Sequence, residues 1–233
     1  MSKFKRLFGQ TNLALYDIYI NKALRDSNQE LQEQRKEQLH ASMLDEDHFC
    51  VRRALLAMLQ KDQRPHSILT LLKFADGHAR HKKWQEILDR AHLSTPADTE
   101  RRFILSKQLY VYCTPDKLIR IGKRRYVWEC KGMASHLWRK VQRSQRPPRQ
   151  FVRRLHLYFM ATGINEGILH IDNKDTNEYL AFHVRADAAL MRKLERRARR
   201  VQEAYYYWRA VGRLPKRCKY EKCSCHMRLG GRK

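Results

Sequence analysis

Residues 114–131 read TPDKLIRIGKRRYVWECK, and this stretch decides the prediction of the fold. Leu118–Ile121 and Tyr126–Trp128 are rich in the β-branched and aromatic residues that are typical of strands. Gly122-Lys123 separates them, and a glycine at such a position favours a tight reversal of the chain. The stretch therefore predicts two antiparallel strands joined by a short turn.

Three charged residues border this predicted pair of strands. Asp116 precedes the first strand, and Glu129 and Lys131 end the second, where alternation along a strand places both side chains on one face. Hydrolysis of a phosphodiester uses divalent cations, which prefer oxygen ligands, and an amine beside them can orient water or neutralise developing charge. An edge-strand salt bridge with Asp116 as a turn residue is the structural alternative, but the placement on successive strands favours chemistry.

The rest of the chain alternates between helical and strand patterns. Apolar residues recur at three- and four-residue spacing in six segments. This predicts helices at 1–40, from an N-cap at Ser42 to an end at Pro65, at 68–92 as one or two helices, and at 134–142, 150–162 and 186–211. Further strands are predicted at 103–105, 109–112, 167–171 and 179–184, the last two as a hairpin. We predict an α/β fold with a mixed central sheet flanked by helices: a helical extension over residues 1–41 and one domain over residues 42–233.

The composition points to a polyanionic partner. The chain has 233 residues, with 49 Lys and Arg against 24 Asp and Glu, and its formal charge is +25. Nucleic acid is the partner that best explains such an excess. A membrane is disfavoured, because no apolar run approaches the roughly 18 residues of a spanning helix, and no secretion signal is evident. We therefore expect a cytoplasmic protein, in which the six cysteines are thiols or metal ligands and not disulfides.

The C-terminal region concentrates soft ligands. Cys218, Cys223 and Cys225 lie within eight residues of one another in a basic tail, and clustered thiolates usually surround a metal ion. His226 could complete a zinc site with three cysteines. The alternative without metal is a disordered tail. Cys113 and Cys130 are expected in the core.

Two basic stretches are candidates for contact with nucleic acid. The predicted helix 186–211 carries several arginines, followed by an aromatic run at 205–208. Arginines bind phosphates and aromatic rings stack on unpaired bases, so this combination suits nucleic-acid binding. The second stretch follows the strand that carries Glu129. The candidate DNA contacts are Arg139, Lys140, Arg154, Arg192, Arg196 and Arg199. We expect the aromatic side chains of 205–208 to lie mostly in the core.

The residues around Asp116 also resemble a known family. Pro115-Asp116, twelve intervening residues and Glu129-x-Lys131 resemble the PD-(D/E)XK nuclease superfamily, and the similarity to its RecB-like branch covers roughly 42–225. Upstream, Gly77 followed four residues later by His81 resembles the helix histidine of that branch. The resemblance implies catalysis by Asp116, Glu129 and Lys131, with metal ligands at His81, Asp116, Glu129 and the main-chain carbonyl of Cys130, and Glu100 as an accessory acid.

The resemblance extends to the cysteines and has one departure. Cys50-Val51-Arg52 is similar to the Cys-x-Arg element of iron–sulfur nucleases of the AddB and CRISPR-adaptation type. It implies a [4Fe–4S] cluster on Cys50, Cys218, Cys223 and Cys225, although the late spacing differs and zinc is the alternative. The branch usually has a glutamine four residues before the helix tyrosine, where this chain has Arg154 before Tyr158.

These observations predict a Mg2+- or Mn2+-dependent deoxyribonuclease that acts on DNA ends or single strands. The resemblance suggests DNA processing in recombination or replication, encoded by a phage or mobile element, in which case the cytoplasm is the host's. The alternative from another class is a non-catalytic nucleic-acid-binding protein with a zinc-type cysteine module. In that case Asp116, Glu129 and Lys131 form salt bridges only.

Overall fold

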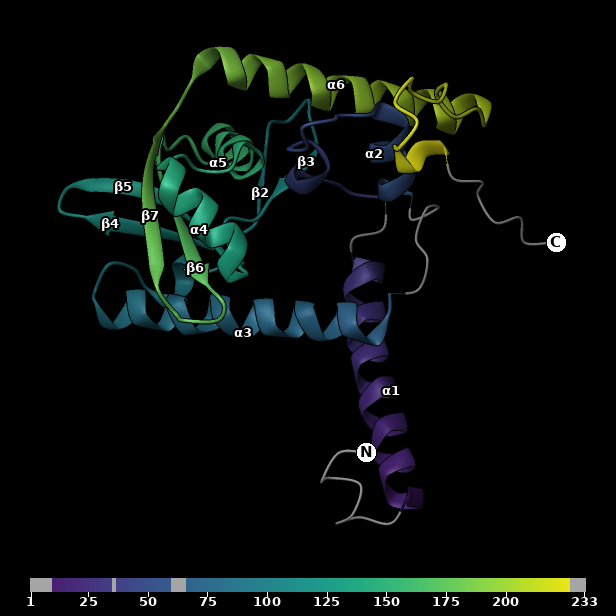
Figure 1. Cartoon of the computed structure of the whole chain (residues 1–233). Coiled ribbons are helices and arrows are strands. Elements are labelled where there is room, and N and C mark those ends of the chain that lie inside the picture. The colour runs from purple at the N-terminus through teal and green to yellow at the C-terminus, as the bar shows by residue number, and fades with distance from the viewer. Residues whose placement is uncertain (1–9, 35–36, 60–65, 227–233) are drawn as a thin grey trace.

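The computed structural model describes residues 10–34, 37–59 and 66–226 and has a mixed α/β fold (Figure 1). The predicted α/β class, with a mixed sheet flanked by helices, is confirmed. In chain order the elements are α1 (Gln10–Gln34), β1 (Leu39–His40), η2 (Ala41–Met43), α2 (Val51–Met58), α3 (Ile68–Arg90), η3 (Pro96–Asp98), β2 (Phe103–Ile104), β3 (Val111–Cys113), β4 (Lys117–Ile121), β5 (Arg124–Met133), α4 (Ser135–Ser144), α5 (Arg149–Thr162), β6 (Glu166–Asn173), β7 (Tyr179–Arg185), α6 (Ala188–Val211) and η4 (Ser224–His226).

The larger sheet has the strand order β4-β5-β6-β7. Both predicted hairpins are present: β4 pairs antiparallel with β5, and β6 pairs antiparallel with β7. Gly122 makes the first turn with a φ of +59°, a conformation that glycine adopts without steric cost. β5 and β6 are parallel, and α4 and α5 form the crossover between them. The sheet is therefore mixed, and β5 lies inside it with a partner on each side.

Helix α5 covers one face of this sheet. Its buried Leu155 and Phe159 belong to the same core cluster as Val127 of β5 and Leu169 of β6. The approach is close at Gly167, where a Cβ would lie 2.8 Å from Phe159 Cε1. Only glycine allows the strand and the helix to meet there, so this contact fixes α5 relative to β5.

Helix α3 covers the opposite face, and the segment 68–92, which the sequence predicts as one or two helices, forms one continuous helix. Ser67 caps its N-terminus by accepting a hydrogen bond from the Thr70 amide at 3.2 Å. Trp84 packs against Trp128 and Cys130 of β5. The buried Asp172 of β6 accepts a hydrogen bond from Arg80 Nη1 at 2.8 Å, which anchors the helix to the sheet. His81, which lies between these two anchors in the sequence, is thereby held beside the sheet.

The N-terminal part of the chain differs from the prediction. Leu39–His40 pairs parallel with β3 in a second, three-stranded sheet of order β1-β3-β2. Ser42 is not the N-cap of a helix: it lies in η2, and α2 begins only at Val51, after Cys50. The reason is that Asp45 and Asp47 form ion pairs with arginines of α5, and these pairs keep segment 45–47 out of a helix. Pro65, the expected end of this helix, lies outside the described residues.

Helix α6 begins where predicted and crosses the molecule on the side opposite α3 (Figure 1). Asp187 caps it by accepting hydrogen bonds from two amides, and Leu194, Ala198 and Val201 form its buried face. Its aromatic run is not mostly core, because Tyr206 and Tyr207 are more than half exposed. None of the helices within the described residues combines the length and the apolar character that crossing a bilayer requires.

Candidate active site

The three charged residues of the 114–131 stretch meet at the edge of the sheet. β4 begins at Lys117, which pairs with Trp128, so the following residues of β5 have no partner from β4. The Asp116 carboxylate takes this place and accepts a hydrogen bond from the Cys130 amide at 2.7 Å. Lys131 Nζ lies 2.7 Å from Glu129 Oε1 and 3.7 Å from Asp116 Oδ2. Two acids and one amine thus lie together where β4 begins.

Helix α3 brings a histidine to the same point. His81 Nδ1 lies 3.4 Å from Asp116 Oδ1. One turn later, Gln85 donates hydrogen bonds to the Asp116 carbonyl at 3.0 Å and to Glu100 Oε1 at 3.4 Å. Glu100 itself has a φ of +46° and its amide donates to the Asp116 carbonyl. Gln85 was not a predicted site residue, because a polar residue on a polar helix face gives no signal in the sequence.

These groups border one cleft. Its volume is about 250 Å³, and its walls include all five predicted side chains: His81, Glu100, Asp116, Glu129 and Lys131. The fourth predicted metal ligand, the carbonyl of Cys130, accepts a hydrogen bond from Lys131 Nζ at 2.8 Å. The structure therefore gathers oxygen, imidazole and amine groups in a single place.

The electrostatics of the cleft favour a bound cation. Burial raises the pKa of Glu129, and the charge of Asp116 raises it further. Glu129 Oε2 is buried and has no hydrogen-bond partner within the described part of the chain. Lys131 and Arg154 lie beside Oε1, so Oε2 is the oxygen left without a partner among the described residues, and a buried polar atom of this kind is costly unless a ligand occupies the position in front of it. The donor set, which is carboxylates, a carbonyl and an imidazole, suits Mg2+ or Mn2+.

The basic groups of the cleft are ready for their expected roles. Burial and the charge of Lys131 lower the pKa of His81 to about 4, so its imidazole is neutral at pH 7, as a metal ligand must be. Burial opposes the charging of Lys131, but Asp116 and Glu129 outweigh it and raise its pKa. Lys131 therefore stays a cation.

Arg154 of α5 occupies the wall of the same cleft. Its Nη1 lies 3.5 Å from Glu129 Oε1, and its Nε donates to Asp45 Oδ2 at 2.6 Å. The residue that departs from the expected glutamine thus faces the buried Glu129 directly. The sequence does not predict Asp45 as a site residue, because it lies 109 residues from Arg154 in the chain.

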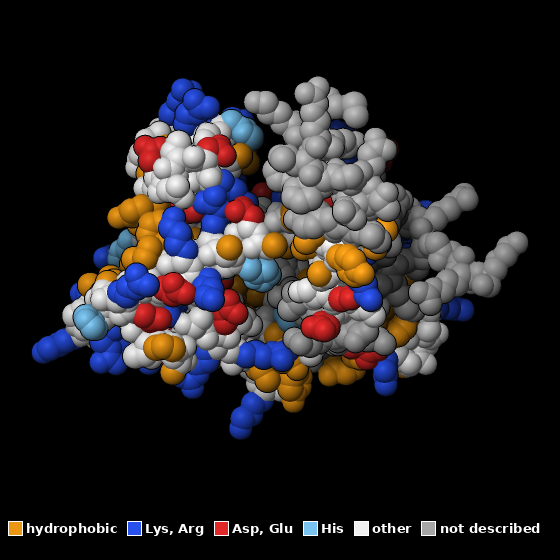
Figure 2. All heavy atoms as spheres, turned by 90° about the horizontal axis from the view of Figure 1, so that it is seen from below, with side chains coloured by type: hydrophobic (Ala, Val, Ile, Leu, Met, Phe, Trp, Pro, Cys, Tyr) orange, Lys and Arg blue, Asp and Glu red, His pale blue; other side chains and the backbone are white. Residues whose placement is uncertain are grey.

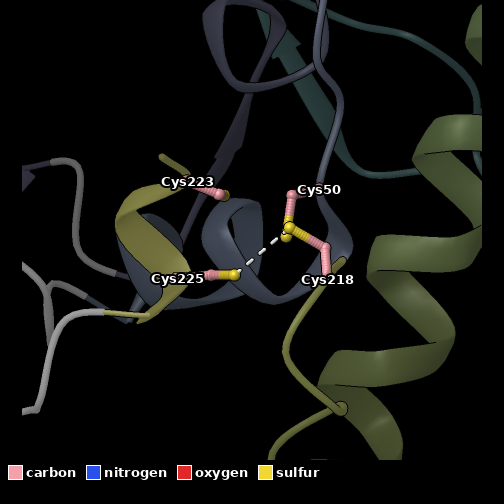
Figure 3. A group of neighbouring side chains, drawn as sticks. All are labelled: Cys50, Cys218, Cys223 and Cys225. Carbon is pink, nitrogen blue, oxygen red and sulfur yellow. Dashed lines mark hydrogen bonds between the residues drawn. The ribbon is translucent and has the colours of Figure 1, made fainter. Parts of the chain in front are cut away.

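The four predicted cysteines also come together, at the end of the molecule where the C-terminal segment meets α2 (Figure 3). The Sγ atoms of Cys50, Cys218, Cys223 and Cys225 all lie within 4.8 Å of one another. Burial raises the pKa of Cys50 to about 12, whereas a hydrogen bond with His48 lowers that of Cys218 to about 5. Four thiols in this arrangement fit a tetrahedral metal or an iron–sulfur cluster. Cys113 and Cys130, expected in the core, are fully buried.

The remaining candidate DNA contacts are exposed and divided between two sides of the molecule. Arg139 and Lys140 project from α4, and Arg192, Arg196 and Arg199 project from α6. α6 packs on α5 and α2, on the side away from α3. Figure 2 views the face below α3, where Lys and Arg side chains are interspersed with acidic and apolar ones. The positive charge is not gathered into one uniform field on that face.

Comparison with known proteins identifies the fold. The chain aligns with an alkaline exonuclease (LHK-Exo) from Laribacter hongkongensis at a TM-score of 0.58 and 14% identity, covering 79% of this chain and 97% of that one. Its fold is of the PD-(D/E)XK nuclease type. The complex of LHK-Exo with dAMP aligns at a TM-score of 0.54 and 14% identity, covering 76% and 95% of the two chains.

A third similar structure is SSO0001, with a TM-score of 0.52, 17% identity, and coverage of 76% of this chain and 85% of that one. No family model and no curated protein matches the chain. The likeness is therefore one of fold, and the site residues of this chain have to be judged on their own geometry.

Proposed function

We propose that this protein is a Mg2+- or Mn2+-dependent deoxyribonuclease. The observation that carries the proposal is the meeting of Asp116, Glu129 and Lys131 in one cleft, with Glu129 Oε2 buried and unpartnered among the described residues. A salt bridge alone would not require a second buried acid beside the first. The PD-(D/E)XK type of the fold and the exonucleases among the similar structures support the same reading.

Each residue of the cleft has a part in this proposal. His81, Asp116, Glu129 and the carbonyl of Cys130 would hold the cation, which polarises the phosphate and activates water when it is bound. Lys131 keeps its proton and places a positive charge where negative charge develops on the phosphate. Glu100, which lines the same cleft and accepts a hydrogen bond from Gln85, is the accessory acid.

The substrate is proposed to be DNA, at ends or in single strands. The formal charge of +25 favours a polyanion, and two of the similar structures are of an exonuclease, one of them in complex with dAMP. We assign contacts with the DNA backbone to Arg139, Lys140, Arg154, Arg192, Arg196 and Arg199. Such contacts predict binding that weakens steeply as the salt concentration rises.

We propose further that the cysteine centre holds a [4Fe–4S] cluster, with Zn2+ as the alternative. All four ligands are sulfur, and the centre joins the start of α2 to the C-terminal segment (Figure 3). The absorption spectrum of the protein as isolated separates the two. A brown protein that absorbs in the visible range contains iron–sulfur, and a colourless protein loaded with zinc contains the alternative.

Hydrolysis of labelled linear DNA in the presence of Mn2+ tests the function. We expect cleavage by the wild type, loss of cleavage in Lys131→Ala, and retained cleavage in Lys123→Ala, which removes the same charge from the exposed turn between β4 and β5. Equal cleavage by the wild type and Lys131→Ala would contradict the proposal. Tight DNA binding without cleavage by any of the three would favour a non-catalytic nucleic-acid-binding protein. Covalently closed circular DNA in the same assay distinguishes an exonuclease from an endonuclease.

A further inference from the structure

A buried acid outside the catalytic set lies next to the cleft. Asp45 is 2% exposed and sits between η2 and α2, in a segment without regular structure. Its carboxylate accepts a hydrogen bond from Arg154 Nε at 2.6 Å. Burial raises the pKa of Asp45, and the charge of Arg154 acts in the opposite direction. A buried ion pair is seldom worth more to stability than an apolar pair of the same size, so this one calls for another role.

The backbone around Asp45 is fixed from several directions. Arg197 of α6 donates from Nη1 to the carbonyls of Leu44 and Glu46, at 2.7 and 2.9 Å. Arg153 of α5 donates to the carbonyl of Asp45 itself. Because these arginines hold the main chain on both sides of it, the Asp45 carboxylate has a defined position against α5.

That position orients Arg154 towards the catalytic acids. The guanidinium is planar, so a hydrogen bond at Nε sets the direction of its other nitrogens. Nη1 is thereby directed at Glu129 Oε1, at 3.5 Å, and the side chain lies in the wall of the cleft. A guanidinium that faces a metal-binding carboxylate can also contact a phosphate bound in front of it.

The same position creates a problem of charge. A cation that binds Glu129 has to share that carboxylate with Lys131 and Arg154, both of which are within 3.5 Å of it. The negative charge of Asp45 offsets that of Arg154. Without Asp45, the arginine would repel the metal ion and compete for Glu129 without any compensation.

We propose that Asp45 is a positioning residue of the hydrolytic site: it directs Arg154 at the phosphate of the bound DNA and balances its charge so that a divalent cation can still bind Glu129. This inference rests on the proposed function and deepens it. If the charges of Asp45 and Arg154 compensate each other, removing one should change the Mn2+ affinity, and removing both should restore it.

Calorimetric titration with Mn2+, without DNA, tests the charge balance. Asp45→Asn retains the shape of the side chain and should weaken Mn2+ binding on the order of tenfold, as loss of a residue behind a metal ligand commonly does. Arg154→Gln should tighten it. Asp45→Asn/Arg154→Gln, which replaces a charged pair by a neutral hydrogen-bonded pair, should return close to the wild-type affinity while DNA hydrolysis stays impaired.

Asp47→Asn is the matched control. Asp47 also accepts a hydrogen bond from an arginine of α5, Arg153, at 2.7 Å, but its side chain is 76% exposed. We expect Mn2+ affinity within about twofold of the wild type, because an exposed charge is largely screened. Thermal unfolding of each variant shows whether it is folded.

The possible outcomes separate this inference from the proposed function. Wild-type affinity in Asp45→Asn, or no recovery in the double variant, would refute the role of Asp45 while the nuclease assignment stands. A purely structural role would lower the unfolding temperature of Asp45→Asn without the compensating pattern in Mn2+ affinity. No Mn2+ binding by the wild type would overturn the metal-dependent function itself, and the role of Asp45 with it.

Discussion

Removal of the cysteine centre should destabilise the whole fold. Cys50 precedes α2, and Cys218 lies about 170 residues later, so a metal held by both closes most of the chain into a loop (Figure 3). The chain-entropy relation for a cross-link gives about 5 kcal/mol for a loop of that length. For a chain of this size, that free energy corresponds to a fall in the unfolding temperature of roughly 10–20 °C.

The assay is thermal unfolding of the metal-loaded wild type and of Cys218→Ser, each before and after treatment with a chelator. We expect the chelator to lower the unfolding temperature of the wild type to about that of Cys218→Ser, and to leave the variant nearly unchanged. Each protein is then its own control for damage caused by the substitution. An unfolding temperature of the wild type that does not respond to loss of the bound metal would refute the reasoning that the centre stabilises the fold.

Three further predictions concern the scaffold. Burial lowers the pKa of His170 from 6.5 to about 4, so the unfolded chain binds more protons than the folded chain between these pH values. The free energy of unfolding should therefore fall by up to about 3 kcal/mol as the pH drops from 6.5 to 4. Urea unfolding at several pH values should show a smaller pH dependence in His170→Phe. Arg80→Met leaves the fully buried Asp172 without its ion-pair partner and should lower the free energy of unfolding by about 3–5 kcal/mol. Arg199→Met, which breaks an exposed pair with Glu195, should lower it by less than about 1 kcal/mol. Equal losses in urea unfolding would contradict this difference. Gly167→Ala places a Cβ 2.8 Å from Phe159 and 2.9 Å from the Val127 carbonyl and should lower the free energy of unfolding by about 1–3 kcal/mol. Gly77→Ala places a Cβ where no atom of the described residues lies within 4 Å and should stabilise α3. Wild-type stability in Gly167→Ala would argue against the close approach of α5.

The central part of the fold was predictable because its signals are local. The turn at Gly122 and the alternation around Glu129 are encoded in neighbouring residues, and they predict both the hairpin and the shared face of Glu129 and Lys131. The meeting of Asp116 with these residues follows from the same hairpin. The family resemblance added His81 and Glu100, which no local pattern places at the site.

The contacts missed by the sequence analysis are those made between distant segments. Asp45 and Arg154 are 109 residues apart, and Gln85 and Asp116 are 31 apart. Ser42 is a residue type that often caps helices, but no α-helix begins there. Asp45 and Asp47 bind arginines of α5, and these contacts hold the chain in a non-helical conformation. Tyr206 and Tyr207 are exposed because only one face of α6 packs on the core, which a continuous aromatic run does not reveal.

Anomalous diffraction at the manganese edge, from crystals of the protein soaked in Mn2+, tests the central claim most directly. The account predicts a peak bonded to carboxylate oxygens of both Asp116 and Glu129, with His81 and the carbonyl of Cys130 as the neighbouring ligands and Lys131 Nζ beside it. A peak elsewhere, or no peak at saturating Mn2+ with the two carboxylates in place, would contradict it.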